Sequence, residues 1–311
     1  MDSSFWVNLA FLVPLGCIFA VWAERMIRQE RTATGQSPPT PGQTRRRLIG
    51  LTLVYAALTV ALSVSAELGM QSTPEVQPTT WGFFLRRCSH QLLIGFILVA
   101  MAVDWDGYVI PDQITLPGTL LGVAGAVAVG QLQLIHLWVD WSYALPQIRG
   151  PWIPAWIDAH RHLHGLAWSL AGLIAGAGLT AIVRSVSSRL MGLETLGTGD
   201  ITFMALIGSF LGWQPTVCAF LAAPLLGLAV GLPLKLVTNK PYIPYGPFLG
   251  AGALLTLFAW GPIWGRTKDI FGDWLALLIL FALASVSFVV LFGLLILYRR
   301  LPGRTTSDQN N

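Results

Sequence analysis

The residues of this chain best suited to chemistry are four aspartates in two short stretches. Three of them lie in VDWDGYVIPDQITLPG (103–118), and the fourth, Asp200, ends the segment GTGD (197–200) directly before an apolar run. Ionisable groups at the edge of the hydrocarbon are costly and usually mark function. These carboxylates are therefore the first candidates for a functional site.

Two carboxylates brought close together in a low-dielectric site cannot both ionise easily, so they share a proton and hold a water molecule between them. One carboxylate takes a proton from the water while the other protonates a substrate carbonyl, which is aspartyl-protease chemistry and requires no metal. Asp200 is equally well explained as a helix cap, because a carboxylate accepts the unpaired N–H groups of a first turn. Asp106 is a helper of Asp104 or an interfacial loop residue, and Asp112 either caps the next helix or holds the loop near the site.

The elements that must position these aspartates are predicted to be membrane helices. The chain has 311 residues, of which 54% are hydrophobic and only 11% are charged, whereas a soluble domain carries about 25% charged residues. The composition predicts an all-α, polytopic helix bundle of eight or nine transmembrane helices. The candidate spans are 5–23, 48–66, 90–106, 115–135, 163–183, 201–213, 215–234, 247–262 and 275–298.

The distribution of basic residues predicts the orientation of this bundle. With the N-terminus outside, 13 of the 19 Lys and Arg residues fall on the inner side and six on the outer side. Because Lys and Arg concentrate in cytoplasmic loops, the pattern favours N-out/C-in. Asp104 then ends an inward-running span and Asp200 begins an outward-running one, so both lie at the cytoplasmic level. The net charge of +4 is small and divided among the loops. It therefore reflects the orientation of the chain in the membrane rather than nucleic-acid binding, which requires a clustered basic face.

The segments between the spans are predicted to be short and mostly polar. Residues 24–47 form a short cytoplasmic linker, 136–162 an external loop rich in Trp and Pro, and 301–311 a disordered tail. The first apolar run is a retained span, because ERMIRQER follows it in place of a cleavage site. Small-xxx-small pairs predict close helix packing; they are Gly118/Gly122, Gly172/Gly176, Gly208/Gly212, Gly227/Gly231 and Gly246/Gly250.

Three ordered segments resemble the type IV prepilin peptidases, a family of GxGD membrane aspartyl proteases. In that family an aspartate is followed eight residues later by the Asp of a Leu/Ile-Pro-Asp triplet, as in DWDGYVIPDQITLP (104–117). The second family segment reads E-x-x-G-x-G-D, and Glu194, Gly197, Gly199 and Asp200 match it. The third, IPYGPFLG (243–250), resembles the family's Ile-Pro-Phe-Gly-Pro-Phe-Leu.

The resemblance implies an aspartic endopeptidase without a cofactor. It implies that Asp104 and Asp200 are the catalytic pair, on a single membrane-embedded domain whose catalytic core covers about 90–262. It also implies cleavage of the leaders of type IV prepilins or pseudopilins at the cytoplasmic face of the bacterial inner membrane, in pilus assembly or type II secretion. The supporting motif residues are Gly197, Gly199, Pro111, Asp112, Glu194, Pro244, Gly246 and Pro247.

Two departures from the family pattern limit what carries over. The lysine that the family has two residues after its second aspartate is Thr202 here. Many bacterial members also have a cytoplasmic domain with paired CxxC motifs after the first span, and they methylate the new N-terminus. Residues 24–47 are too short for that domain and contain no cysteine. N-methyltransferase activity is therefore not expected.

Other functions explain some of the same features. A transporter or a proton or cation channel also uses membrane-edge aspartates, and a family member without activity would act as an assembly factor. His160, His162 and His164 form a candidate metal cluster, although an interfacial polar loop explains them better and no metal site is predicted. The three cysteines lie far apart without a CxxC pair, which argues against zinc and disulfides.

Overall fold

The computed structural model describes residues 3–139, 153–192, 196–231 and 243–283, with 233–234, 237 and 286 as isolated additions. Apart from a single β-bridge between Thr73 and Val76, these residues contain no strand, which confirms the all-α fold class. The helices are α1 (Ser3–Ala33), α2 (Pro41–Glu67), α3 (Thr80–Gly107), α4 (Asp112–Val129), α6 (Trp156–Ala159), α7 (Arg161–Met191), α8 (Thr198–Leu211), α9 (Trp213–Leu226), the π-helix η1 (Gly227–Gly231), α11 (Gly246–Phe258) and α12 (Trp260–Gly272). A further apolar helix covers Trp274–Leu283.

Five of the described helices are long and apolar enough to cross a membrane, and a bent pair makes a sixth if it is counted as one span. The five are α2, α3, α4, α7 and the continuous segment Trp213–Gly231; the bent pair is α11 with α12. Helix α8 is apolar but shorter. The polytopic membrane bundle is thus confirmed, while the count of eight or nine spans and the N-out/C-in orientation stay predictions.

The predicted span 247–262 is not one straight helix, because the chain bends by 91° between α11 and α12. Trp260, Trp264 and Phe271 of α12 are buried, whereas Arg266 and Asp269 on its other face are exposed. Helix α12 thus has one buried apolar face and one exposed charged face.

Two other predicted boundaries also differ from the structure. Helix α4 ends at Val129 and does not reach 135, because Gly130 takes the left-handed conformation that stops a helix (φ 68°). Helix α3 begins at Thr80, so two arginines expected in an outer loop lie inside it. Both are buried: Arg86 donates a hydrogen bond to the carbonyl of Gln133, and Arg87 pairs with Glu67.

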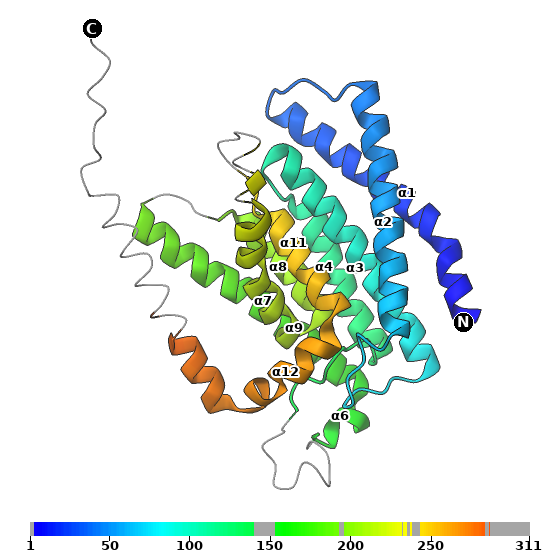
Figure 1. Ribbon diagram of the computed structural model, residues 1–311, viewed down its shortest axis with the longest axis vertical. Helices are drawn as coiled ribbons and strands as arrows, with labels where there is room; N and C mark the ends of the chain where they lie inside the picture. Colours follow the sequence, from blue (N-terminus) through cyan, green and yellow to red (C-terminus); the bar gives the residue numbers. More distant parts are fainter. Residues whose placement is uncertain are drawn as a thin grey trace.

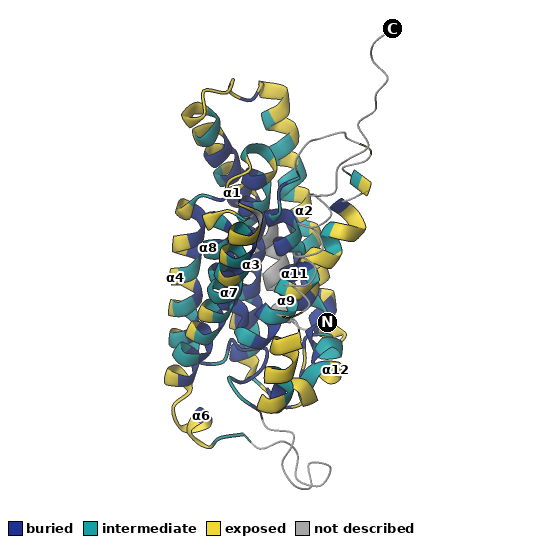
Figure 2. Ribbon diagram, turned by 90° about the vertical axis from the view of Figure 1, so that its left-hand side faces the viewer, coloured by how far each residue is buried: buried dark blue, intermediate teal, exposed yellow. Residues whose placement is uncertain are grey.

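Helix α3 is the central element of the bundle. In its most apolar stretch 67% of the residues are buried, compared with 28–33% in the other four spanning helices. Helices α1, α2, α4, α8 and α11 all pack against it. In Figure 2 the buried residues follow the inner faces of the helices, and the exposed residues lie on the outer faces and at the two ends. Helix α3 is therefore held on several sides by neighbouring helices, which fixes the position of the residues that it carries.

Glycines bring the neighbouring helices into close contact, as the small-residue pairs predicted. A Cβ atom on Gly172 of α7 would overlap the carbonyl oxygen of Gly208 on α8, and one on Gly208 would overlap that of Gly172. On the opposite side of α8, Gly122 of α4 faces Ser209 and Phe210. Backbones approach this closely in a membrane only where side chains are small.

The two ends of the bundle are distinct (Figure 1). The turn between α1 and α2 lies at one end, and α6 lies at the other. Helix α3 runs toward the α1–α2 turn, and Arg31 near the end of α1 is hydrogen-bonded to Asp106 near the end of α3. We call this end, which also holds the start of α8, the aspartate end.

Candidate active site

The chain leaves α3 directly after the first aspartate by way of a left-handed residue. Tyr108 has φ 57°, and its N–H donates to the carbonyl of Asp104, which ends the helix. Non-glycine residues seldom adopt this conformation. Two residues of extended chain follow, and Pro111 then becomes the N-cap of α4. This turn keeps Asp104 on the last turn of a helix while the Ile-Pro-Asp triplet folds back beside it.

The carboxylate of Asp104 is buried and held by the third motif segment. The residue is 6% exposed, and its Oδ2 accepts a hydrogen bond of 2.9 Å from the backbone N–H of Gly246. Gly246 is the first residue of α11, and Pro247 occupies the first turn, where it displaces no helical hydrogen bond. The buried Pro244 precedes them in the connecting segment. The segment IPYGP thus presents a backbone donor to the first aspartate.

Asp200 lies in the first turn of α8 and is 9% exposed. Its Oδ2 accepts a hydrogen bond of 2.9 Å from the N–H of Gly197, the N-cap residue. The prediction that Asp200 caps the start of α8 is therefore confirmed. Among the described residues, however, its Oδ1 has no hydrogen-bond partner, so capping uses only half of the carboxylate.

The backbone of Ile110 fits between the other two motif segments. A Cβ atom on Gly199 would lie 2.7 Å from the Ile110 carbonyl oxygen, and one on Gly246 would lie 2.9 Å from its Cδ1. Side chains on either glycine would therefore force these three segments apart. Ile110 is itself 5% exposed. Its position explains physically why glycine occupies both 199 and 246.

The two carboxyl groups act on each other. Asp200 is near enough to Asp104 for the pair to interact electrostatically, although 95 residues separate them in the chain. Tyr245 lies beside them: burial raises its pKa to about 12, and the charge of Asp200 adds to this shift. Tyr245 is therefore close enough to Asp200 to feel its charge. A buried carboxyl pair of this kind has the chemistry of an aspartyl protease.

Asp112 and Thr202 join the first two motif segments at the rim of the site. Asp112 is the first residue of α4, and its Oδ1 accepts a hydrogen bond of 3.3 Å from the Thr202 hydroxyl. Position 202 is where the resembling family has lysine. Asp112 therefore holds the start of α4 beside α8, as one of its two suggested roles predicted, whereas α4 has Pro111 as its N-cap residue and no side-chain cap hydrogen bond.

Asp106 does not contact Asp104 through any hydrogen bond among the described residues and instead binds two arginines. Arg31 donates two hydrogen bonds to its carboxylate, of 2.7 and 2.8 Å, and Arg47 donates a third of 3.0 Å. Arg47 also pairs with Glu24. The sequence did not indicate these partners, because nothing in the local pattern links 31 or 47 to 106. Asp106 fastens the α1–α2 hairpin to the end of α3.

The histidines lie at the opposite end of the bundle and diverge. His162 Nδ1 contacts the carbonyl of Val127, whereas His164 Nε2 accepts the N–H of Leu137. Within the described ranges, no three His, Cys, Asp or Glu side chains are grouped as metal ligands. Glu194, which the motif includes, lies outside the described residues, as do residues 140–152 of the loop predicted at 136–162.

Comparisons with known proteins agree with this site. The pattern of the type IV leader peptidase family matches residues 91–232. The prepilin leader peptidase/N-methyltransferase of Aeromonas salmonicida is 30% identical over 55% of this chain and 48% of its own length. That of Burkholderia pseudomallei is 27% identical over 55% and 46%, and that of Escherichia coli 25% identical over 64% and 73%.

The chain spans about half the length of the Aeromonas and Burkholderia relatives. No solved structure matches it. The matched region includes both buried aspartates, Gly197, Gly199 and the Ile-Pro-Asp triplet. Residues 91–232 of this chain, which hold both buried aspartates, are thus similar to the type IV leader peptidase family.

Proposed function

We propose that this protein is an intramembrane aspartic endopeptidase that cleaves the N-terminal leaders of type IV prepilins or pseudopilins. One observation carries the proposal: two buried, interacting carboxyl groups, Asp104 and Asp200, are brought together from α3 and α8. The relatives' names, prepilin leader peptidase/N-methyltransferase, supply the substrate class.

The geometry supports a mechanism in which the pair shares one proton and a water molecule. The carboxylate takes a proton from the water as the water oxygen attacks the scissile carbonyl carbon, and the carboxylic acid protonates the carbonyl oxygen. As the diol collapses, one of its hydroxyl groups returns a proton to the second carboxylate, the C–N bond breaks, and the leaving nitrogen receives the proton held by the first carboxyl group. The N–H groups of Gly246 and Gly197 hold the two side chains in place during these steps.

We also propose that the site faces the cytoplasm from the bacterial inner membrane. The end of α1 and the start of α2 carry Arg28, Arg31 and residues 45–47 (all arginine), and the turn that joins these helices lies at the aspartate end. Arg and Lys flanking membrane spans favour the cytoplasmic side. A leader that precedes an apolar helix would place its scissile bond at this level of the membrane.

The peptidase reaction is the only activity in this proposal. Some relatives are also named N-methyltransferases. In this chain α1 and α2 are joined by residues 34–40, which contain no cysteine. We therefore expect the purified protein to transfer no methyl group from S-adenosylmethionine to the cleaved product, and detection of a methylated N-terminus would contradict this.

The decisive experiment compares prepilin cleavage by the detergent-purified protein with cleavage by Asp104→Asn and Asp200→Asn. Asparagine keeps the size of the side chain but removes the titratable proton, so each change should lower kcat/KM by at least about 100-fold. Asp269→Asn, an exposed aspartate on α12, is the matched control and should cleave normally. Full activity in either single variant would show that Asp104 and Asp200 are not a catalytic pair.

A further inference from the structure

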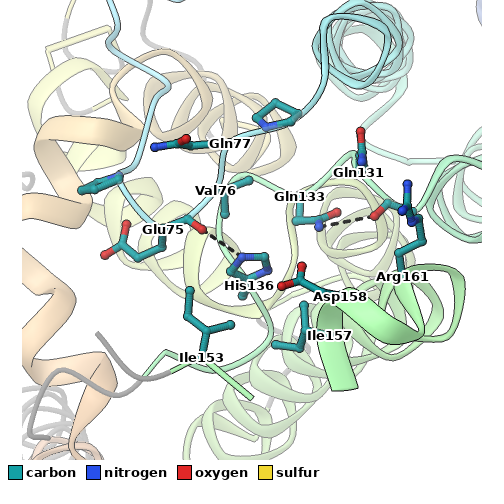
Figure 3. A pocket seen from close by; sticks show the side chains of 13 residues that line it. Glu75, Val76, Gln77, Gln131, Gln133, His136, Ile153, Ile157, Asp158 and Arg161 are labelled. Carbon is teal, nitrogen blue, oxygen red and sulfur yellow. Dashed lines mark hydrogen bonds between the residues drawn. The ribbon is translucent and has the colours of Figure 1, made fainter. Parts of the chain in front are cut away.

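A cavity of about 570 Å³ lies at the end of the bundle opposite the aspartates. Its described lining comes from residues 72–78 between α2 and α3 and from Thr80, Phe83 and Arg86 at the start of α3. Part of the same connection also lines a second cavity, of about 510 Å³, which is drawn in Figure 3. Arg86 precedes Asp104 by 18 residues on one helix, which corresponds to about 27 Å at the helical rise. The cavity is therefore far from the proposed peptidase site.

Two adjacent arginines of α3 are buried here, and they differ in their partners. Arg86 and Arg87 are 4% and 3% exposed. Arg87 Nη2 lies 3.2 Å from Glu67 Oε1, whereas no carboxylate of the described residues pairs with Arg86. The charge that acts on Arg86 is that of Arg87, which has the same sign. Burying a charge without a counter-ion is costly, so a buried arginine of this kind points to a bound anion.

The guanidinium group of Arg86 is held in place and still has donors to offer. Nη1 donates a hydrogen bond of 3.1 Å to the carbonyl of Gln133, and the guanidinium carbon lies 5.4 Å from the centre of the Phe83 ring. Nε and Nη2 have no hydrogen-bond partner among the described residues, and both retain accessible surface, whereas the unpaired Nε and Nη1 of Arg87 are enclosed. Nε and Nη2 form the edge of a guanidinium that binds two oxygens of a carboxylate or a phosphate at once.

Two hydroxyl groups in the lining add further donors. Ser72 and Thr80 are exposed, and within the described ranges neither side chain makes a hydrogen bond to the protein. The Thr73 hydroxyl also lies in the lining but is occupied, because it donates to the carbonyl of Leu134 at 3.0 Å. Thr80 is the first residue of α3, where unpaired N–H groups and the helix dipole favour an anion. A phosphate group has more oxygens than the guanidinium edge binds, so these donors favour phosphate over carboxylate.

The cavity lies where a membrane helix meets the lipid headgroups. Helix α3 is one of the spanning helices and begins at Thr80. Trp81 is 72% exposed and packs edge-to-face against Phe84, with 5.7 Å between the ring centroids, and Leu85 is 37% exposed. An exposed tryptophan at the end of a spanning helix is typical of the membrane–water interface. The phosphate groups of phospholipids are therefore the anions available at the level of Arg86.

We propose that this cavity binds the phosphate group of an anionic phospholipid. Nε and Nη2 of Arg86 each donate to one phosphate oxygen, and the hydroxyl groups of Ser72 and Thr80 donate to others. The acyl chains lie outside the cavity, along the exposed side chains of Trp81 and Leu85. A free phosphate ion offers the same oxygens without acyl chains, so a comparison of the two distinguishes the sources of this ligand.

The test measures lipid binding to the full-length, delipidated protein in neutral detergent. Dioleoyl-phosphatidylglycerol should bind saturably and raise the unfolding temperature. Dioleoyl-phosphatidylcholine has the same acyl chains and a phosphate but brings a cation beside Arg86, so it should bind at least about tenfold more weakly. Equal binding of the two lipids would overturn the proposal. So would a saturable effect of inorganic phosphate at equal ionic strength that matches the effect of phosphatidylglycerol, because the ligand would then be a free anion.

Three variants locate the site. Arg86→Lys keeps the charge but loses the planar edge, and it should weaken phosphatidylglycerol binding by about tenfold. Thr80→Val removes one hydroxyl donor at an exposed position, where the fold does not depend on it, and should weaken binding by roughly three- to tenfold. Arg266→Lys makes the same replacement at an exposed arginine of α12 outside the cavity and should bind normally. Unchanged affinity in both cavity variants would refute the assignment.

Discussion

At the scale of single residues, the positions of the two aspartate side chains depend on close backbone packing at neighbouring glycines. Asp104 and Asp200 are each held by one backbone N–H, from Gly246 and Gly197. These donors reach the carboxylates because Ile110 packs against glycine on both sides. Asparagine at position 104 or 200 tests whether the carboxyl group is needed for the reaction. Alanine in place of a neighbouring glycine tests whether the position of the carboxyl group is needed.

Gly246→Ala should impair cleavage although it removes no functional group. Its Cβ would lie 2.5 Å from Asp104 Oδ2 and 2.9 Å from Ile110 Cδ1, so the carboxylate must move. A displacement of about 1 Å near the reacting atoms costs about 100-fold in rate, and we expect a loss of that order in kcat/KM. Steady-state prepilin cleavage measures it.

Gly50→Ala is the control, because a Cβ atom at Gly50 in α2 meets no atom within 4 Å. It should cleave prepilin at the normal rate. If Gly246→Ala were as active as Gly50→Ala, the close contact to Asp104 would have no catalytic consequence.

At the scale of the helices, ion pairs join the α1–α2 hairpin to α3, the helix that carries Asp104. The network contains Glu24, Arg31, Arg47 and Asp106, and it ties α1 and α2 to the last turn of α3. Asp106 is two residues from Asp104. The second acidic residue of the motif therefore fixes the end of the helix that carries the first.

Arg31→Gln should loosen this connection. Arg31 makes a two-hydrogen-bond contact with Asp106, and the side chains are only 21% and 12% exposed. Hydrogen bonds to charged groups in such settings stabilise by about 1–2 kcal/mol. The unfolding temperature in detergent should fall by a few degrees, and prepilin cleavage should slow with it.

Arg28→Gln provides a comparison on the same helix. Its side chain is 47% exposed, pairs with Glu24 four residues earlier and donates an exposed hydrogen bond of 2.8 Å to the Thr44 hydroxyl of α2. An exposed i,i+4 pair contributes about 0.3–0.5 kcal/mol. Arg28→Gln should change the unfolding temperature little. Equal destabilisation by the two variants would show that the Arg31–Asp106 ion pair stabilises the protein no more than an exposed ion pair does.

At the scale of the whole molecule, the distance between the two aspartates is set by how the helices cross. Helix α8 lies between α7 and α4 and also contacts α3. The crossing of α7 and α8 depends on Gly172 and Gly208, whose backbones touch. A bulkier residue there would move α8 and Asp200 together.

Gly172→Ala should therefore destabilise the bundle even though alanine favours a helix. The added methyl group would overlap the Gly208 carbonyl, and overpacking of this kind costs about 1–3 kcal/mol. Thermal unfolding in detergent should show a lower midpoint. Gly178→Ala on the same helix meets no atom within 4 Å, so its midpoint should not fall; equal midpoints would contradict the close crossing.

The sequence by itself determined the membrane class, the all-α fold and the two aspartates, because hydropathy and motif spacing are local properties of the chain. The small-residue pairs likewise indicated where helices approach, since glycine has few other uses inside a membrane helix. The sequence did not determine the end of a helix where that end depends on contacts with residues far away in the chain. Helix α12 turns aside because Trp260 and Trp264 find a buried surface that no local pattern describes.

Only the tertiary structure decided what each carboxylate contacts. Asp200 both caps α8 and interacts with Asp104, a combination that the sequence presented as alternatives. Asp106 binds Arg31 and Arg47 because three helix ends meet at one corner of the bundle. Contacts between residues 59 to 96 positions apart depend on helix crossings, and these crossings depend on packing that involves most of the bundle.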